Sequence, residues 1–127
     1  MRGMDLIGLA VGGAAGTLCR YGITMLALRS LGPRFAFGTL AVNVSGCFVL
    51  GLLMHLFGES PAASRALRLA LTTGFLGGFT TFSTFGYETV RYWESGETTL
   101  AFANVAANVV LGVLATWAGL LAARAAL

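Results

Sequence analysis

Long apolar stretches alternate with short polar ones along the whole chain. Four of the apolar stretches are long enough to cross, as helices, the roughly 30 Å hydrocarbon core of a bilayer. The pattern predicts an all-α integral membrane protein, a single four-helix domain over residues 1–127 with spans at about 5–28, 35–57, 65–93 and 99–123. Met1 and Arg2 precede the first stretch as in a signal peptide, but its length and Arg20 favour a retained span.

The third apolar stretch is a poor helix, although no charged residue interrupts its centre. Gly74, Gly77 and Gly78 lie close together, and the threonines around them are β-branched, so helix propensity is low. We predict a break at Gly77-Gly78, in a helix started by Ser60-Pro61. Backbone groups freed by a break cannot face hydrocarbon. The segment is therefore expected to be buried among other helices, with its free carbonyls binding an ion.

The other spans carry small or polar residues at helical spacing. On the first span, Gly8, Gly12 and Gly16 share a face suited to close helix packing. Arg20 continues this face, either in a water-filled vestibule or snorkelling to the interface. Asn43, in the middle of the second span, is either a contact between helices or a pore-lining residue.

Polar side chains also form a track on the fourth span and stripes on the third. The track repeats every four residues, through Asn104, Asn108, Gly112 and Thr116. Beyond the predicted break, the third span carries Thr81, Thr84 and Glu88 near one face, with Phe82 and Phe85 on a neighbouring stripe. An aromatic pair at this spacing is usually core packing, whereas two asparagines on one face favour a polar pathway.

Composition excludes several classes of function. The chain is 57% hydrophobic and only 10% charged, against about 25% charged in soluble domains. All eight basic residues are arginine, so the net charge of +3 indicates membrane-flanking charge rather than nucleic-acid binding. One histidine and no phosphate-binding loop argue against an enzyme. Cys19 and Cys47 lie in apolar spans without a metal-ligand spacing, as small packing residues do.

The arginines divide almost evenly between the two ends of the predicted bundle. Four spans place Arg2, Arg65, Arg68 and Arg124 on one side, against Arg29, Arg34 and Arg91 on the other. The positive-inside rule then gives little bias, which predicts insertion in both orientations and an antiparallel pair with its two-fold axis in the membrane plane. The alternative is a single orientation set by one extra arginine.

Three stretches together resemble a known family. The run Gly74-Phe75-Leu76-Gly77-Gly78-Phe79-Thr80-Thr81-Phe82-Ser83-Thr84-Phe85 is similar to the defining motif of the Fluc (CrcB) family of fluoride channels. Gly38-Thr39-Leu40-Ala41-Val42-Asn43 resembles its second-helix motif, and the region of Arg20 its first. The resemblance implies an antiparallel homodimer in the cell inner membrane, with two pores for passive fluoride export that reduces fluoride toxicity, and a central structural sodium ion.

The resemblance also assigns roles to individual residues. Backbone carbonyls of Gly77 and Thr80 from both chains would hold the sodium ion. The pore would be lined by the following residues, with Arg20 in its vestibule: Asn43, Phe82, Phe85, Ser83, Thr84, Glu88, Asn104 and Asn108. The family often carries Tyr and Ser in the fourth helix, where this chain has Asn104 and Asn108.

These residue types suit the passage of fluoride, which is small and strongly hydrated. Amide NH₂ and hydroxyl groups are neutral donors that replace water, and aromatic ring edges are electropositive. Arg20 would concentrate anions at the mouth of the pore. The sequence leaves three possibilities open for Glu88: it lies off the pathway, it is held by threonine hydroxyls, or it is partly protonated.

Two other functions fit parts of the pattern. A small dual-topology multidrug-type transporter for cationic compounds also has four helices, but it needs a carboxylate deep in the first one. Asp5 lies at the edge of that helix, and Glu88 is the only deep acid. A structural membrane subunit would suit the glycine face of the first span and would leave the polar tracks unexplained.

Overall fold

The computed structural model describes residues 2–60 and 62–127, in which every regular element is helical. Two continuous α-helices come first, α1 (Gly3–Leu31) and α2 (Phe37–Glu59). The last crossing, Thr98–Ala126, consists of α6 (Thr98–Ala106), the π-helical η2 (Ala107–Leu111) and α7 (Gly112–Ala126). Each of these three crossings is long and apolar enough to traverse a membrane.

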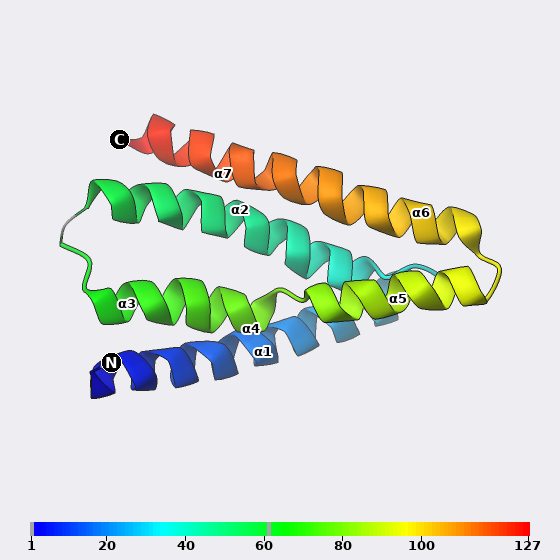
Figure 1. The fold of residues 1–127 in the computed structure, drawn as a ribbon, viewed down its shortest axis with the longest axis horizontal. Coiled ribbons are helices and arrows are strands. Elements are labelled where there is room, and N and C mark those ends of the chain that lie inside the picture. The colour runs from blue at the N-terminus through cyan, green and yellow to red at the C-terminus, as the bar shows by residue number, and fades with distance from the viewer. Residues whose placement is uncertain (1, 61) are drawn as a thin grey trace.

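The third crossing consists of four consecutive helical pieces, and Figure 1 shows its ribbon interrupted before the last of them. They are α3 (Arg65–Leu69), the π-helical η1 (Ala70–Leu76), α4 (Gly77–Phe79) and α5 (Phe82–Glu94). Successive crossings run in opposite directions, and both chain termini lie at the same end of the bundle. This arrangement fits the predicted four crossings. Pro61 lies outside the described residues, and Ser64 caps α3 by accepting the Leu67 N–H at 3.2 Å.

The third crossing breaks at Thr80 and Thr81, so the prediction of a break at Gly77-Gly78 is wrong. Gly77 keeps helical angles (φ −64°, ψ −36°), whereas Thr80 (φ −84°, ψ 157°) and Thr81 (φ −150°, ψ 110°) are extended. Gly78 serves close packing, because a Cβ there would lie 2.5 Å from the Gly13 carbonyl oxygen of α1. Helix packing thus overrides the low propensity of glycine, and the β-branched threonines take the extended conformation they favour.

Glycine faces bring helix backbones into direct contact, as predicted for α1. A Cβ at Gly12 would collide with the Ala70 carbonyl of η1, and a Cβ at Gly16 would collide with the Phe75 carbonyl. On α2, Gly51 approaches the backbone of α7 in the same way. Small residues at such positions allow the close approach that membrane helices use in place of a hydrophobic core.

Few side chains are buried inside the single chain. The interior cluster is small, with Val42, Leu76 and Phe79 at its centre. Many large apolar side chains are exposed instead, among them Leu18 and Val113. A water-soluble protein rarely exposes so much contiguous apolar surface, so lipid or another protein chain covers these faces.

A candidate ion pathway at the broken crossing

Asn43 pairs with both backbone groups of Thr81, an extended residue at the break. Its Oδ1 accepts the Thr81 N–H at 2.8 Å, and its Nδ2 donates to the Thr81 carbonyl at 3.1 Å. Thr81 also caps α5, because its hydroxyl accepts the Thr84 N–H at 3.2 Å. Side chains therefore satisfy the extended residue, as an interruption at membrane depth requires.

Because side chains accept these backbone N–H groups, two carbonyls beside the break lose the donors they would have in a continuous helix. In an unbroken α-helix, Gly77 would accept from the N–H of Thr81, and Thr80 from that of Thr84. Those two N–H groups go instead to the side chains of Asn43 and Thr81. Gly77 is exposed, and apart from the nearby backbone of its own helix no described atom lies within 4 Å of where its Cβ would be. Gly77 and Thr80 therefore carry neutral carbonyl oxygens without their usual helical donors.

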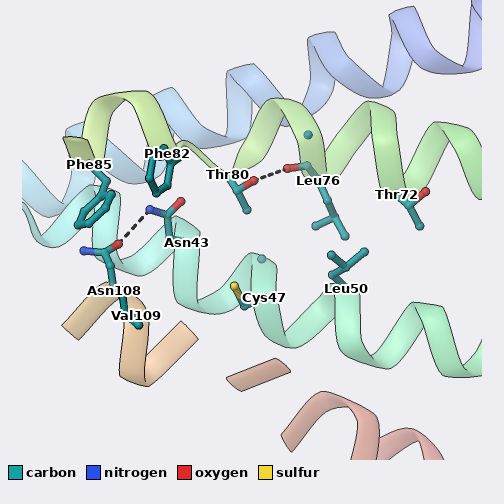
Figure 2. Close-up of a pocket in the computed structure, with 12 residues that line it drawn as sticks. Asn43, Cys47, Leu50, Thr72, Leu76, Thr80, Phe82, Phe85, Asn108 and Val109 are labelled. Carbon is teal, nitrogen blue, oxygen red and sulfur yellow. Dashed lines mark hydrogen bonds between the residues drawn. The ribbon is translucent and has the colours of Figure 1, made fainter. Parts of the chain in front are cut away.

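A cavity of about 370 Å³ lies beside the break, bordered by α2, η2 and the third crossing. Its lining includes four predicted pore residues and both predicted carbonyl ligands: Asn43, Phe82, Phe85, Asn108, Gly77 and Thr80. In Figure 2 the amides of Asn43 and Asn108 face each other, with the two phenylalanine rings beside them. The fold therefore brings amide groups, ring edges and freed carbonyls to one place.

The two phenylalanines of this cavity differ sharply in exposure. Their ring centroids are 5.4 Å apart, and the ring planes are inclined at 59°. Phe85 is 8% exposed and belongs to the packed interior, whereas Phe82 is 82% exposed. Phe82 therefore presents its ring to whatever covers the open side of the cavity.

Two asparagines of the fourth crossing link Asn43 by hydrogen bonds to the interior of the chain. Asn108 accepts the Asn43 amide on its Oδ1 at 3.0 Å. Its own Nδ2 donates to the carbonyl oxygen of Asn104 at 2.9 Å and to Oδ1 of Asn104 at 3.1 Å. Asn104 is 0% exposed and lies behind the cavity rather than in its lining. The assignment of Asn104 to the pore stays a prediction.

Three other predicted residues lie outside this cavity. Ser83 and Thr84 are exposed on the first turn of α5, with their hydroxyl oxygens 3.4 Å and 3.0 Å from that of Thr81. Arg20 is half-buried on α1 and forms no ion pair or hydrogen bond with the residues that the structure describes. Ser83 and Thr84 thus place hydroxyl groups on the exposed start of α5, outside the cavity lining.

Glu88 borders a second, smaller cavity of about 210 Å³, formed with α2, the end of α1 and the loop between them. The hydroxyl of Thr39 donates to Oε1 of Glu88 at 2.7 Å. The other carboxyl oxygen, Oε2, is buried and has no hydrogen-bond partner in the described part of the chain. The contact with a threonine hydroxyl that was considered for Glu88 is therefore present.

Sequence reasoning did not single out Thr39 or Thr89, both of which contact predicted site residues. Thr39 precedes Asn43 by one helical turn on α2, a spacing that places both on one face. Thr89 follows Phe85 by one turn, and its hydroxyl accepts the Asn104 amide at 3.0 Å. Helical spacing alone could have suggested Thr39, whereas the contact of Thr89 depends on how α5 and α6 pack.

A helix broken at membrane depth, re-paired by an asparagine and bordered by an uncharged cavity that contains amide groups, defines a multi-pass membrane protein of the channel and transporter class. Residues 7–120 match the family model described as CrcB-like protein, Camphor Resistance (CrcB). The chain therefore belongs to the CrcB family, and the resemblance of its motifs to that family is confirmed.

Similar proteins cover nearly the whole chain. A protein of Geobacter sp. (strain M21) named fluoride-specific ion channel FluC is 48% identical over 121 residues, 95% of this chain and 98% of that protein. Proteins of the same name from Rhizobium etli and Geobacter sulfurreducens are 50% and 49% identical; they align with 92% and 94% of this chain, and 94% and 96% of their own lengths are covered. These relatives are ion channels, so the family is not one of enzymes.

Proposed function

We propose that this chain is the subunit of a fluoride-selective channel that lets fluoride leave the cell passively through the inner membrane. The name shared by its relatives supports fluoride as the permeating ion. The structural support is the cavity at the break, where two amides and two aromatic rings meet in an uncharged setting. Neutral donors can accompany an anion without binding it so tightly that it fails to leave.

Fluoride enters this cavity beside the Asn43 amide. Nδ2 of Asn43, which donates to Oδ1 of Asn108 at 3.0 Å, shares its N–H group with the passing ion. The edges of Phe82 and Phe85 carry partial positive charge and face the ion beside the amide. Arg20, Ser83 and Thr84 extend the pathway at its ends. Glu88, which accepts a hydrogen bond from Thr39, borders the second cavity, and we place this cavity on the same pathway.

The proposed assembly is an antiparallel homodimer with two pores and a sodium ion at its centre. The large exposed apolar surface of the single chain supports a partner, and the 82% exposure of Phe82 supports one near the cavity. Gly77 and Thr80 would hold the sodium ion by their backbone carbonyls, two from each chain. Such neutral, hard oxygen ligands suit an alkali ion, and the described residues hold no cluster of histidine, cysteine or carboxylate side chains for another metal.

The cation-transporter alternative gains no support from the position of Asp5. This carboxylate is buried at the end of α1, where its Oδ2 lies 3.5 Å from Nε of Arg65. An acid already paired at the end of the bundle does not provide the deep carboxylate of the first helix that such a transporter needs.

Purified protein in liposomes is expected to release fluoride rapidly and chloride negligibly. Fluoride-selective and chloride-selective electrodes, used on the same vesicles, measure both rates. In the same assay Phe82→Ile is expected to reduce fluoride release, because it removes the ring edge from the cavity. Phe102→Ile is the matched control, since Phe102 is also exposed but packs against Trp93 away from the cavity. Equal release of both anions by the unmodified protein would refute fluoride selectivity.

Removal of sodium is expected to destabilise the assembled protein as well as to reduce fluoride release. A ligand that binds only the folded assembly raises its apparent stability by RT ln(1 + [L]/Kd), which amounts to about 2.7 kcal/mol at 100 times Kd. Thermal unfolding and fluoride release are compared in sodium and in N-methylglucamine, at equal ionic strength. Identical unfolding temperatures and identical release in both media would remove sodium from the proposal.

A further inference from the structure

A continuous chain of side-chain hydrogen bonds runs from the break in the third crossing into the interior and back to α5. The Asn43 amide donates to Asn108, whose amide donates to Asn104. The Asn104 amide donates to the Thr89 hydroxyl at 3.0 Å, and that hydroxyl donates to the Phe85 carbonyl at 2.8 Å. We call this set the amide relay: Asn43, Asn108, Asn104 and Thr89.

Each amide in the relay has only one orientation that satisfies its neighbours. Asn108 directs its NH₂ group at both oxygen atoms of Asn104, so its side-chain oxygen is left to face Asn43. Asn43 must then turn its nitrogen toward Asn108 and its oxygen toward the Thr81 N–H. Reversing one amide would place two donors or two acceptors face to face inside the membrane, where an unpaired group is expensive.

Both ends of the relay hold the same turn of helix. One end is Asn43, which pairs with both backbone groups of Thr81. The other end is the carbonyl of Phe85, reached by Thr89 at 2.8 Å and by the Asn104 amide at 3.5 Å. The turn between them is the first of α5 and carries Phe82. The relay therefore fixes the phenylalanine pair relative to the Asn43 amide.

We propose that Asn104 and Thr89 are positioning residues for fluoride passage, acting through the relay without lining the cavity. This inference rests on the proposed function and gives the two residues a role that does not require contact with the ion. Burial supports it for Asn104, which is 0% exposed. Connectivity supports it for Thr89, the only described side chain whose oxygen accepts the Asn104 amide.

A matched pair of threonine substitutions separates the relay from ordinary helix packing. Thr89 and Thr116 both donate to the carbonyl one turn earlier, at 2.8 Å and 3.0 Å. Of the two hydroxyls, only that of Thr89 also accepts from Asn104. We expect Thr89→Val to reduce fluoride release about five- to tenfold, the effect of one hydrogen bond, and Thr116→Val to leave it unchanged. Equal release by both variants would overturn the proposal.

A double-substitution cycle tests whether Thr89 acts through the relay. Asn108→Leu cuts the chain between Asn43 and Asn104. In that background Thr89→Val is expected to cause no further loss of fluoride release, because coupled residues are non-additive. If the fold-loss of fluoride release in the double variant equals the product of the fold-losses in the two single variants, Thr89 acts independently of Asn108, and the proposal is wrong.

Hydrogen exchange at the Thr81 amide provides a readout that does not depend on fluoride transport. This N–H donates to Asn43 at 2.8 Å, and neither Thr89 nor Asn104 contacts it. We expect Thr89→Val to accelerate its exchange and Thr116→Val to leave it unchanged. If the unmodified protein releases no fluoride, the channel proposal fails while this measurement still tests the relay. Unchanged exchange in correctly assembled Thr89→Val protein would exclude the relay.

Discussion

Replacing Asn43 with leucine is expected to abolish fluoride release, lowering it at least about a hundredfold. The side chain pairs with both backbone groups of Thr81 and donates to Asn108. Leucine has a similar size but leaves the buried N–H of Thr81 without its acceptor, at a cost of about 1–3 kcal/mol. The break would lose its support, and the cavity would lose an amide donor.

Electrode measurements on reconstituted vesicles check this expectation, with Ser45→Ala as the control on the same helix. The Ser45 hydroxyl is exposed and donates to the Ala41 carbonyl of its own helix at 2.6 Å. Its removal is expected to leave release unchanged. Size-exclusion chromatography of the purified variants establishes that both assemble. Release near the unmodified level from assembled Asn43→Leu protein would contradict the assigned role of this amide.

Adding a single methyl group at Gly16 is expected to destabilise the folded chain more than any other small change on α1. The Cβ of Gly16→Ala would collide with the Phe75 carbonyl, a backbone atom that moves only if α1 and η1 separate. Overpacking of this kind typically costs about 1–3 kcal/mol. A lower thermal unfolding temperature and a smaller yield of assembled protein are the expected observations.

The same substitution at Gly22 provides the matched control. No described atom lies within 4 Å of a Cβ at Gly22, and the residue is exposed on the same helix. Alanine is a better helix former than glycine by about 1 kcal/mol, so Gly22→Ala is expected to preserve or raise the unfolding temperature. Unfolding temperatures that rise equally in both variants would mean that Gly16 does not hold α1 against η1.

The order of the elements followed from the lengths of the apolar stretches, whereas the exact position of the break did not. Apolar length predicted α2 over 35–57, and the helix is Phe37–Glu59. Local propensity placed the break at Gly77-Gly78, because glycine is a weak helix former in isolation. Contact with α1 decides the outcome, since Gly78 packs against Gly13 and stays helical. A contact between residues so distant in the chain cannot be read from local pattern.

The candidate site was predictable as a set of residue types but not as a network. Helical spacing placed Asn104 and Asn108 on one face, and they do contact each other. The pairing of Asn43 with Thr81 joins different helices and depends on the conformation of the break itself. The burial of Asn104 likewise depends on how α6 packs against α5.

The wide turn at η2 has a consequence for how the fourth crossing tolerates changes in length. Each residue of an α-helix advances the chain by about 100° around its axis, and the i→i+5 pattern of a π-helix advances it less. Because a π-helical turn holds an extra residue, deleting one residue from Ala107–Leu111 would return this segment to an α-helix and leave the later side chains of α7 close to their present azimuth. Gly119, whose missing Cβ admits the Phe48 carbonyl, would keep its contact with α2. A one-residue deletion in the regular α-helix between Gly112 and Gly119 would instead rotate Gly119 by about 100° away from α2 and disrupt the helix seam.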